Sequence, residues 1–568
     1  MRLTYNQRLF ILQLVFLLIF TIIWVQLFNL QILKSQGLIS EAKKQFYQQQ
    51  IKLRGDIRDR NGELLALNII TYDLYNNTDK IEKIPKEKIT NLARILNTST
   101  EKLTEKLSQR KNTRIFSGIS EAQISEIKKG YLNILYPFAK SVRAYPHKRM
   151  AAHILGFINS DGKGQHGIES YYDGLITKIA EYSNKPQLYP KGTDIALTID
   201  SILQEYAEEE LRQAAQKSGA TRGAIIALSP KTGELYAWAV YPGFDPNIFY
   251  KEKSIKNWSI TDIYEPGSTF KIITISSALE NMTIEKTSTF FDPGFLKVGK
   301  RTIKNHNKTK PQYINLLELF KQSSNVASAQ VSLSMKPEDF YNSIKTFMIG
   351  RKTGVDLYGE SEGLLLNYKK WRPIDSATTA FGQGAVSVTP LQLACAISSI
   401  ANHGIWVQPH ILKGIWDPNY MLISKSPNEI FTEQVVSVDT ADFVSGLLKQ
   451  SVKESLKAMT YIAGNVPGFE VAGKTGTAQK IRSDGKGYYA GHTVASFIGY
   501  FPADDPRILI LAVIDDPKTG GGWGNTVCGP VFNNVAKVAA KRVLYSQTNP
   551  IMIITDKKTD KTIDEKTN

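Results

Sequence analysis

Cysteine and histidine are both scarce in this sequence of 568 residues. Its two cysteines, Cys395 and Cys528, are too few for a disulfide-based scaffold or for a four-cysteine zinc site. The seven histidines are scattered, and they form no HExxH motif or other paired ligand spacing. A metalloenzyme is therefore disfavoured. We interpret both cysteines as packed thiols, and a disulfide between them stays open.

Extreme composition is also missing. Hydrophobic residues make up 42% of the chain and charged residues 22%, which excludes wholesale disorder, collagen and a polytopic membrane protein. The length allows about three or four domains of roughly 100–200 residues each. The net charge of +17 suits nucleic acid, anionic lipid or an acidic wall polymer equally well. Because the basic residues are spread along the chain, a nucleic-acid binder is the weakest of these interpretations.

The sequence has one long apolar run, residues 9–33. As a helix it would be about 37 Å long, enough to cross a hydrocarbon core of ~30 Å. A buried core helix is disfavoured because such runs usually end sooner, and a cleaved signal peptide because no small-residue cleavage pattern follows. We therefore predict one transmembrane helix at 9–33. Basic residues flank it on both sides, so charge does not orient it.

The remaining sequence shows changes of pattern that indicate several folded parts. Asn61-Gly62 predicts a tight hairpin turn, because these residues tolerate positive φ angles. Short charged helices are predicted between residues 80 and 130. The Pro-containing polar stretch 183–191 is typical of a linker. Strands and helices then alternate from about residue 220 to 545, which predicts an α/β region.

The first motif with chemical meaning is Ser268-Thr-Phe-Lys271. The S-x-x-K pattern occurs elsewhere in the chain, but only here does a Pro-Gly break precede it and an apolar run, 272–279, follow it. These neighbours place Ser268 at the start of a buried helix. Residues i and i+3 share a helix face, so Lys271 lies within reach of the serine hydroxyl. Burial and the positive helix end lower the pKa of a lysine toward that of a general base.

The second motif is Ser323-Ser-Asn325, which follows the amphipathic segment 314–320. Such a polar triplet is ordinarily a loop or a helix cap. Beside a serine–lysine pair, its hydroxyl and amide groups are able to relay a proton and to hold a substrate amide.

The third motif is Lys474-Thr475-Gly476-Thr477. KTG occurs four times, but only this copy follows the alternating pattern of an edge strand, 469–473, and precedes another strand, 492–500. An edge strand can present a cation, two hydroxyls and backbone N–H groups to a peptide carboxylate and an oxyanion. Gly476 lets the backbone of a ligand come close.

A serine, a helical lysine, an SxN triplet and a strand-borne KTGT, in this order, resemble the motifs of penicillin-binding proteins and serine β-lactamases. Overall the chain is similar to the class B penicillin-binding proteins, which are monofunctional peptidoglycan D,D-transpeptidases. Its length and the spacing of its N-terminal part are closest to the septal, division-specific branch. Further stretches that resemble the family are Tyr264–Lys271, Gly382–Gly384, Val388–Leu393, Arg54–Gly62, Arg143–Pro146 and Ala152–Gly156.

The resemblance implies an α/β (α+β) fold in which helices flank the antiparallel sheet of a transpeptidase domain. An elongated β-rich pedestal domain of the dimerisation type, and the transmembrane helix, would precede it. The implied boundaries are 1–8 for a cytoplasmic N-terminus, 40–185 for the pedestal, 186–220 for the linker and entry to the catalytic domain, 221–545 for the transpeptidase domain and 546–568 for a polar tail.

The resemblance also implies the catalytic roles. Ser268 would attack the D-Ala-D-Ala bond of a stem peptide while Lys271 takes its proton. Ser323, aided by the charge of Lys474, would return a proton to the leaving D-alanine, and β-lactams would acylate Ser268. D,D-Carboxypeptidase action would be a side activity. No metal or organic cofactor is required.

The implied substrate-binding residues lie on the SxN triplet and on the KTGT strand. Asn325 would bind the peptide amide, and Thr475 and Thr477 the terminal carboxylate, with Gly476 between them. The backbone N–H groups of Ser268 and Thr477 would form the oxyanion hole.

Stem peptides lie outside the cytoplasmic membrane. The family therefore implies a single-pass protein of the inner membrane with its N-terminus in the cytoplasm and its catalytic domain outside. The implied partners are a polytopic wall-polymerising glycosyltransferase and divisome proteins, with no nucleic acid.

Several alternatives remain. Gly359-Glu-Ser361-Glu-Gly363 fits the G-x-S-x-G elbow of an α/β-hydrolase, although its charged surroundings favour an exposed loop. An elongation-specific transpeptidase, a β-lactamase or lactam sensor, and a catalytically silent scaffold share the same motifs. A fusion with a glycosyltransferase is disfavoured by the roughly 220 residues before the catalytic core.

Overall fold

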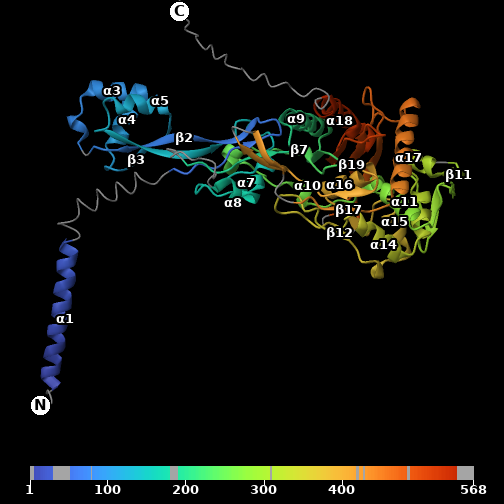
Figure 1. Cartoon of the computed structure of the whole chain (residues 1–568), viewed down its shortest axis with the longest axis horizontal. Coiled ribbons are helices and arrows are strands. Elements are labelled where there is room, and N and C mark those ends of the chain that lie inside the picture. Colours follow the sequence, from blue (N-terminus) through green and yellow to red (C-terminus); the bar gives the residue numbers. More distant parts are fainter. Residues whose placement is uncertain are drawn as a thin grey trace, which may run out of the picture. The chain divides into compact units, whose positions relative to one another are not determined.

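The computed structural model describes residues 5–29, 51–78, 80–178, 190–306, 310–417, 421–425, 429–482 and 487–545. The chain forms two compact units (Figure 1). The smaller unit comprises residues 1–54, 68–142 and 179–192, and the larger comprises 55–67, 143–178 and 193–568. Most of the predicted linker, the predicted polar tail and the end of the predicted membrane span lie outside the described residues.

Helix α1 (Tyr5–Phe28) contains most of the apolar run, residues 9–28 (Figure 1). Its window Ile11–Phe28 has a mean hydropathy of 2.5, and none of that window is buried within the protein. A helix of this length and composition is able to cross a membrane. Its side chains include no charged group between Ile11 and Phe28, so the predicted span is a continuous apolar helix over the part that the structure describes.

The smaller unit packs three helices on β-strands. Strand β2 (Leu64–Asn76) pairs antiparallel with β3 (Arg114–Ile119) and also pairs with β4 (Leu135–Ala144). Serine residues cap two of the helices, and apolar side chains from all three fill the core. The predicted short helices are confirmed as α3 (Lys86–Ile95), α4 (Thr100–Leu107) and α5 (Glu121–Lys128).

A five-stranded antiparallel sheet forms the centre of the larger unit, in the order β18-β19-β20-β6-β7. Alternate side chains of its strands enter two separate apolar cores. Helices α9 and α18 cover one face, and α11 and α16 cover the other. The bounds are β6 (Arg222–Leu228), β7 (Leu235–Tyr241), β18 (Ala472–Ile481), β19 (Tyr488–Phe501), β20 (Ile508–Asp515), α9 (Ser201–Ser218), α11 (Lys271–Glu280), α16 (Pro390–Ala401) and α18 (Gly524–Ala539).

The expected α/β architecture with an antiparallel sheet between helices is therefore confirmed. The other α-helices of the larger unit are α6 (Ala152–Leu155), α7 (Gly167–Tyr171), α8 (Asp173–Thr177), α10 (Trp258–Thr261), α12 (Leu316–Gln322), α13 (Asn325–Leu333), α14 (Pro337–Thr346), α15 (Pro373–Thr379) and α17 (Val438–Lys457). Its short strands are β8 (Thr289–Asp292), β9 (Phe295–Val298), β10 (Arg301–Lys304), β11 (Gln312–Asn315), β12 (Leu364–Leu365), β13 (Val386–Ser387), β14 (Ile405–Val407) and β17 (Thr432–Gln434).

The two cysteines lie on helices of this unit, Cys395 on α16 and Cys528 on α18. Both thiols are buried and free, so the interpretation as packed thiols is confirmed and the disulfide is excluded. The G-x-S-x-G stretch is a loop, in which the Ser361 N–H donates to the Ile260 carbonyl (2.8 Å). Because no strand leads into it and no helix follows it in this described part of the chain, the hydrolase alternative is wrong.

The predicted Asn-Gly hairpin is present in the larger unit. It joins β1 (Ile57–Arg58) to the start of β2, with Ile57 opposite Ala66 and Gly62 at a φ of 97°. Strand β1 also pairs with β5 (Asp194–Leu197), which pairs in turn with β15 (Leu412–Asp417) and, through it, with β16 (Met421–Lys425).

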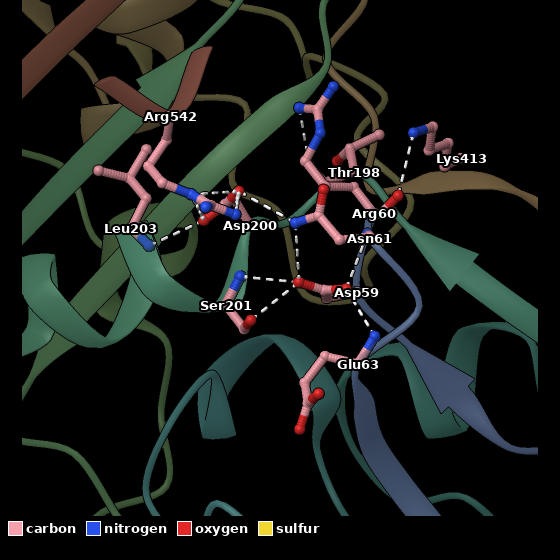
Figure 2. Close-up of polar contacts among 10 residues, drawn as sticks. All are labelled: Asp59, Arg60, Asn61, Glu63, Thr198, Asp200, Ser201, Leu203, Lys413 and Arg542. Atoms are coloured by element: carbon pink, nitrogen blue, oxygen red, sulfur yellow. Dashed lines mark hydrogen bonds and ion pairs between the residues drawn. The ribbon is translucent and has the colours of Figure 1, made fainter. Parts of the chain in front are cut away.

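A polar cluster fixes this hairpin to the start of α9 (Figure 2). The buried Asp59 carboxylate accepts hydrogen bonds from the backbone N–H groups of Asn61 (2.7 Å) and Glu63 (2.8 Å), and from the Ser201 hydroxyl (2.8 Å). Asp200 caps α9 and pairs with Arg542 (2.8 Å). Arg542 lies on a π-helix, Ala540–Tyr545, so the cluster joins three distant parts of the larger unit.

We expect Asp59→Ala to lower the free energy of unfolding by roughly 3 kcal/mol or more, because each buried donor left without an acceptor costs about 1–3 kcal/mol. Urea unfolding followed by tryptophan fluorescence measures this. Glu63→Ala in the same turn is the control: its carboxylate side chain is 57% exposed and pairs with His147, so a change below about 1 kcal/mol is expected. Equal unfolding midpoints for the two variants would contradict the assignment.

Candidate active site

The first predicted residue, Ser268, lies in a 3-10 helix, Gly267–Phe270, that continues directly into α11. The hydroxyl oxygen of Ser268 is 3.0 Å from that of Ser323. Gly267 has a φ of 63°, and a Cβ there would stand 3.1 Å from the carbonyl carbon of Thr477. The turn that carries Ser268 therefore packs backbone to backbone against β18.

Lys271 follows on the first residue of α11 and is completely buried. Its Nζ is 2.5 Å from the Ser323 carbonyl oxygen, 2.9 Å from Asn325 Oδ1 and 3.1 Å from Ser323 Oγ. Burial lowers the pKa of Lys271 well below its usual value, and the nearby Lys474 ammonium lowers it further, while Asp292 opposes both. The uncharged amine is thereby favoured.

Lys271 Nζ donates to three oxygen atoms. The Ser323 carbonyl and Asn325 Oδ1 only accept, so they take two of its N–H groups. The third contact is with the Ser323 hydroxyl, which accepts from Lys271 and itself donates to Ser268 Oγ (3.0 Å). Among the residues described, Lys271 makes no hydrogen bond to Ser268 Oγ, and Ser323 stands between the two.

The SxN triplet forms a sharp turn between two helices. Helix α12 ends at Gln322, and its C-cap residue Ser323 has left-handed backbone angles (φ 54°, ψ 42°). The Ser324 hydroxyl caps α13 by accepting from the Ala327 N–H (3.0 Å). A left-handed non-glycine residue costs on the order of 1 kcal/mol or more. This turn aims both Ser323 and Asn325 at the Lys271 amine.

Two further residues that sequence reasoning missed support the triplet. Asn305 Oδ1 accepts from the backbone N–H groups of Asn325 (2.9 Å) and Val326 (3.1 Å), and its amide nitrogen donates to Asp292 (2.8 Å). The buried Asp292 also accepts from the Ser324 hydroxyl (2.5 Å). Neither residue belongs to a recognisable motif: Asp292 is the last residue of β8, and Asn305 directly follows β10.

The KTGT motif lies on β18, which is the edge strand of the central sheet, as predicted. The strand begins at Ala472 rather than at Phe469, because Phe469 instead forms an isolated bridge with Val466. Lys474 is completely buried, and its Nζ lies 3.3 Å from Thr475 Oγ1. A Cβ at Gly476 would stand 2.2 Å from Ser496 Oγ, so only glycine fits there.

Neighbouring groups orient the two threonine hydroxyls of this strand. Thr475 Oγ1 is 3.2 Å from the hydroxyl of Tyr461, a residue that the sequence did not single out. Thr477 Oγ1 accepts a hydrogen bond from the Gly524 N–H at the start of α18 (3.2 Å). As β18 is an edge strand, alternate backbone N–H groups face away from β19 and are available to a ligand.

The structure brings the predicted residues together from three segments. Ser268, Lys271, Ser323 and Asn325 share one hydrogen-bond network. Lys474 is near enough to act on the Lys271 amine, and the rest of the KTGT strand packs against the turn of Ser268. A serine hydroxyl linked by hydrogen bonds to a buried amine of lowered pKa, beside an edge strand that carries a buried lysine, is an arrangement that can support acyl transfer.

Comparison with known proteins agrees with this geometry. Residues 223–537 match the family described as "Penicillin binding protein transpeptidase domain", and residues 51–178 match "Penicillin-binding Protein dimerisation domain".

Two curated relatives match almost the whole chain. "Stage V sporulation protein D" of Bacillus subtilis is 33% identical over 94% of this chain and 85% of its own length. "Peptidoglycan D,D-transpeptidase FtsI" of Buchnera aphidicola is 30% identical over 94% of each chain.

Among solved structures, penicillin-binding protein 3 of Mycobacterium tuberculosis in complex with aztreonam has a TM-score of 0.68 and 27% identity, over 87% of this chain and 96% of that one. Penicillin Binding Protein 2X of Streptococcus thermophilus has a TM-score of 0.74 at 22% identity, over 88% of this chain and 82% of that one, and supports the fold alone.

Proposed function

Because this chain belongs to the class B penicillin-binding proteins, which are peptidoglycan D,D-transpeptidases, we propose that Ser268 is the nucleophile with which it cross-links stem peptides. The observation that carries this assignment is the chain of contacts from Ser268 Oγ through Ser323 Oγ to Lys271 Nζ (3.0 and 3.1 Å), which ends at a buried amine with a lowered pKa. Such a series of hydrogen-bonded groups can remove the proton of the Ser268 hydroxyl as its oxygen attacks the substrate.

In the proposed acylation, the Ser268 oxygen bonds to the carbonyl carbon between two terminal D-alanines. Its proton passes to the Ser323 oxygen while the Ser323 proton passes to the Lys271 amine. When the tetrahedral intermediate collapses, the C–N bond breaks: the protonated Lys271 returns a proton to the Ser323 oxygen while the Ser323 hydroxyl gives its own proton to the nitrogen of the leaving D-alanine. The adjacent Lys474 charge favours this return by disfavouring the protonated form of Lys271.

Substrate binding is assigned to the strand and to the SxN turn. Lys474, Thr475 and Thr477 would hold the terminal carboxylate, because the strand places two oriented hydroxyls beside a buried cation. Asn325 would bind the peptide amide. The N–H groups of Ser268 and Thr477 would form the oxyanion hole, supported by the close packing of the two backbones at Gly267.

The acyl-enzyme is resolved when the amine of a second stem peptide attacks it, which releases Ser268 and forms the cross-link. This chemistry must occur where stem peptides are, outside the cytoplasmic membrane. We therefore place helix α1 across that membrane as a single-pass anchor, with the N-terminus in the cytoplasm and the transpeptidase domain outside. A wall-polymerising glycosyltransferase and divisome proteins are the proposed partners.

We also propose a septal role, since a relative named FtsI aligns over 94% of each chain. Depletion of the protein tests this: filamentous cells are expected, whereas spherical cells would favour the elongation alternative.

The reaction itself is tested with the full chain in detergent and uncross-linked glycan strands that carry pentapeptide stems. Release of D-alanine together with cross-linked muropeptide dimers, both blocked by benzylpenicillin, is expected. D-Alanine release without dimers would indicate a carboxypeptidase, and neither product would indicate a silent scaffold.

A further inference from the structure

A buried carboxylate, Glu265, lies three residues before Ser268 and has no role in the acylation steps above. The residue is 3% exposed. Oε1 accepts hydrogen bonds from the backbone N–H of Gly384 (2.7 Å) and from the hydroxyl of Tyr488 (3.1 Å). Oε2 is buried and has no hydrogen bond of good geometry among the residues that the structure describes. A buried carboxylate with so few partners is costly, which calls for an explanation.

The first donor belongs to the loop Gly382–Gly384, which follows α15 and runs along the turn of Ser268. The N–H of Gly267 donates to the Gly382 carbonyl (3.1 Å), and a Cβ at Gly382 would stand 2.4 Å from the Gly267 carbonyl oxygen. The loop therefore touches the residue immediately before the nucleophile, and the bond from Gly384 to Glu265 fixes its other end.

The second donor belongs to the sheet. Tyr488 is the first residue of β19 and lies opposite Ile481, the last residue of β18. Its hydroxyl bond to Glu265 thus attaches the outer end of the β18–β19 hairpin, whose other part carries the KTGT motif. One carboxylate consequently joins the nucleophile's segment, the Gly382–Gly384 loop and the substrate-binding hairpin.

The Glu265 carboxylate changes between its protonated and ionised forms near neutral pH. Burial raises the pKa of Glu265 to about 7, while the Gly384 N–H, the Tyr488 hydroxyl and the Gln383 amide each lower it. The groups that face it are Tyr488, whose pKa is raised by burial and by Glu265, and, beside Tyr488, Arg301 of β10. Hydrogen bonds to an ionised carboxylate are roughly twice as strong as those to a neutral one.

We propose that Glu265 is a positioning residue for acylation, whose ionised carboxylate holds the Gly382–Gly384 loop and the Tyr488 end of β19 against the turn that carries Ser268. Protonation of Glu265 weakens both bonds and slows attack by Ser268. The proposal rests on the function proposed above.

The test compares second-order rate constants for acylation by a fluorescent penicillin, measured on the full chain in detergent from pH 5.5 to 9. Glu265→Gln keeps the size of the side chain and mimics its neutral form. The ratio of wild type to this variant cancels the titration of Lys271, which both share. We expect the ratio to rise from near one at acid pH to about tenfold at alkaline pH, with a midpoint near 7.

Tyr488→Phe provides a readout that a purely structural role would not produce. It removes a donor that lowers the pKa of Glu265, so the ratio of Y488F to the double variant Y488F/E265Q should have its midpoint at a higher pH. If E265Q does not fold, the test uses the ratio of the acylation rate constants of the wild type and Y488F, and this ratio should change around pH 7.

The proposal is overturned if the ratio of the rate constants of wild type and E265Q stays constant with pH. It is also overturned if the ratio of Y488F to Y488F/E265Q has the same midpoint pH as the ratio of wild type to E265Q. Acylation of the wild type at pH 8 supports the proposed function whatever these ratios are. A wild type that is not acylated at any pH overturns both.

Discussion

Replacement of Ser268 by alanine should leave the protein completely unlabelled by a fluorescent penicillin, whereas the wild type is labelled covalently. The hydroxyl of Ser268 is the one that contacts Ser323, and through Ser323 it reaches the Lys271 amine. Without this oxygen the acyl-enzyme proposed above cannot form, because its ester bond is made to Ser268 Oγ. In-gel fluorescence of membranes that contain each variant is the measurement.

Ser361→Ala is the matched control for this experiment, since it removes a serine hydroxyl from a G-x-S-x-G sequence that proved to be a loop. It should be labelled like the wild type. Labelling of Ser268→Ala, or loss of labelling in Ser361→Ala, would remove the nucleophile assignment. Labelling that fades within minutes in the wild type would instead indicate a β-lactamase.

Replacement of Lys271 by alanine should lower the acylation rate by roughly 10³-fold, the middle of the range for loss of a positioned general base. In the wild type the uncharged amine is the reactive form. The acylation rate should therefore rise as the pH increases through the lowered pKa of Lys271, and it should fall when the pH is below that pKa. In Lys271→Ala hydroxide must replace the amine, and the residual rate should rise about tenfold per pH unit without a plateau. Stopped-flow acylation over a range of pH measures both profiles.

Lys286→Ala is the control for this variant, because Lys286 lies just beyond α11 and forms an exposed pair with Asp439. Its rate and profile should match those of the wild type. Lys271→Arg separates charge from basicity: an arginine stays protonated and should be as slow as the alanine variant. A plateau near neutral pH in Lys271→Ala would show that another group is the base.

Much of the fold could be predicted because its signals are local. The change of pattern near residue 220 predicts the start of an α/β region, and β6 and β7 begin it, with successive side chains entering one or the other of two cores. The Asn61-Gly62 turn is equally local. The start of β18 was placed too early at Phe469, because an alternating pattern does not reveal where pairing with β19 begins.

The supporting residues of the site could not be predicted in the same way. Asp292, Asn305 and Tyr461 belong to no motif, and each acts through a partner far along the chain or on another element. Glu265 stands in a recognisable motif, yet its two donors come from residues more than a hundred positions away. Such contacts exist only after the segments pack together.

By itself the sequence determined the apolar helix, the order of the three motifs and the family to which they belong, since these depend on residue types and their spacing. Only the tertiary structure decided that Ser323 stands between Ser268 and Lys271, and that burial lowers the pKa of Lys271. The physical reason is that hydrogen-bond distances and desolvation are set by whichever distant segments exclude water around a group, and a local pattern does not contain that information.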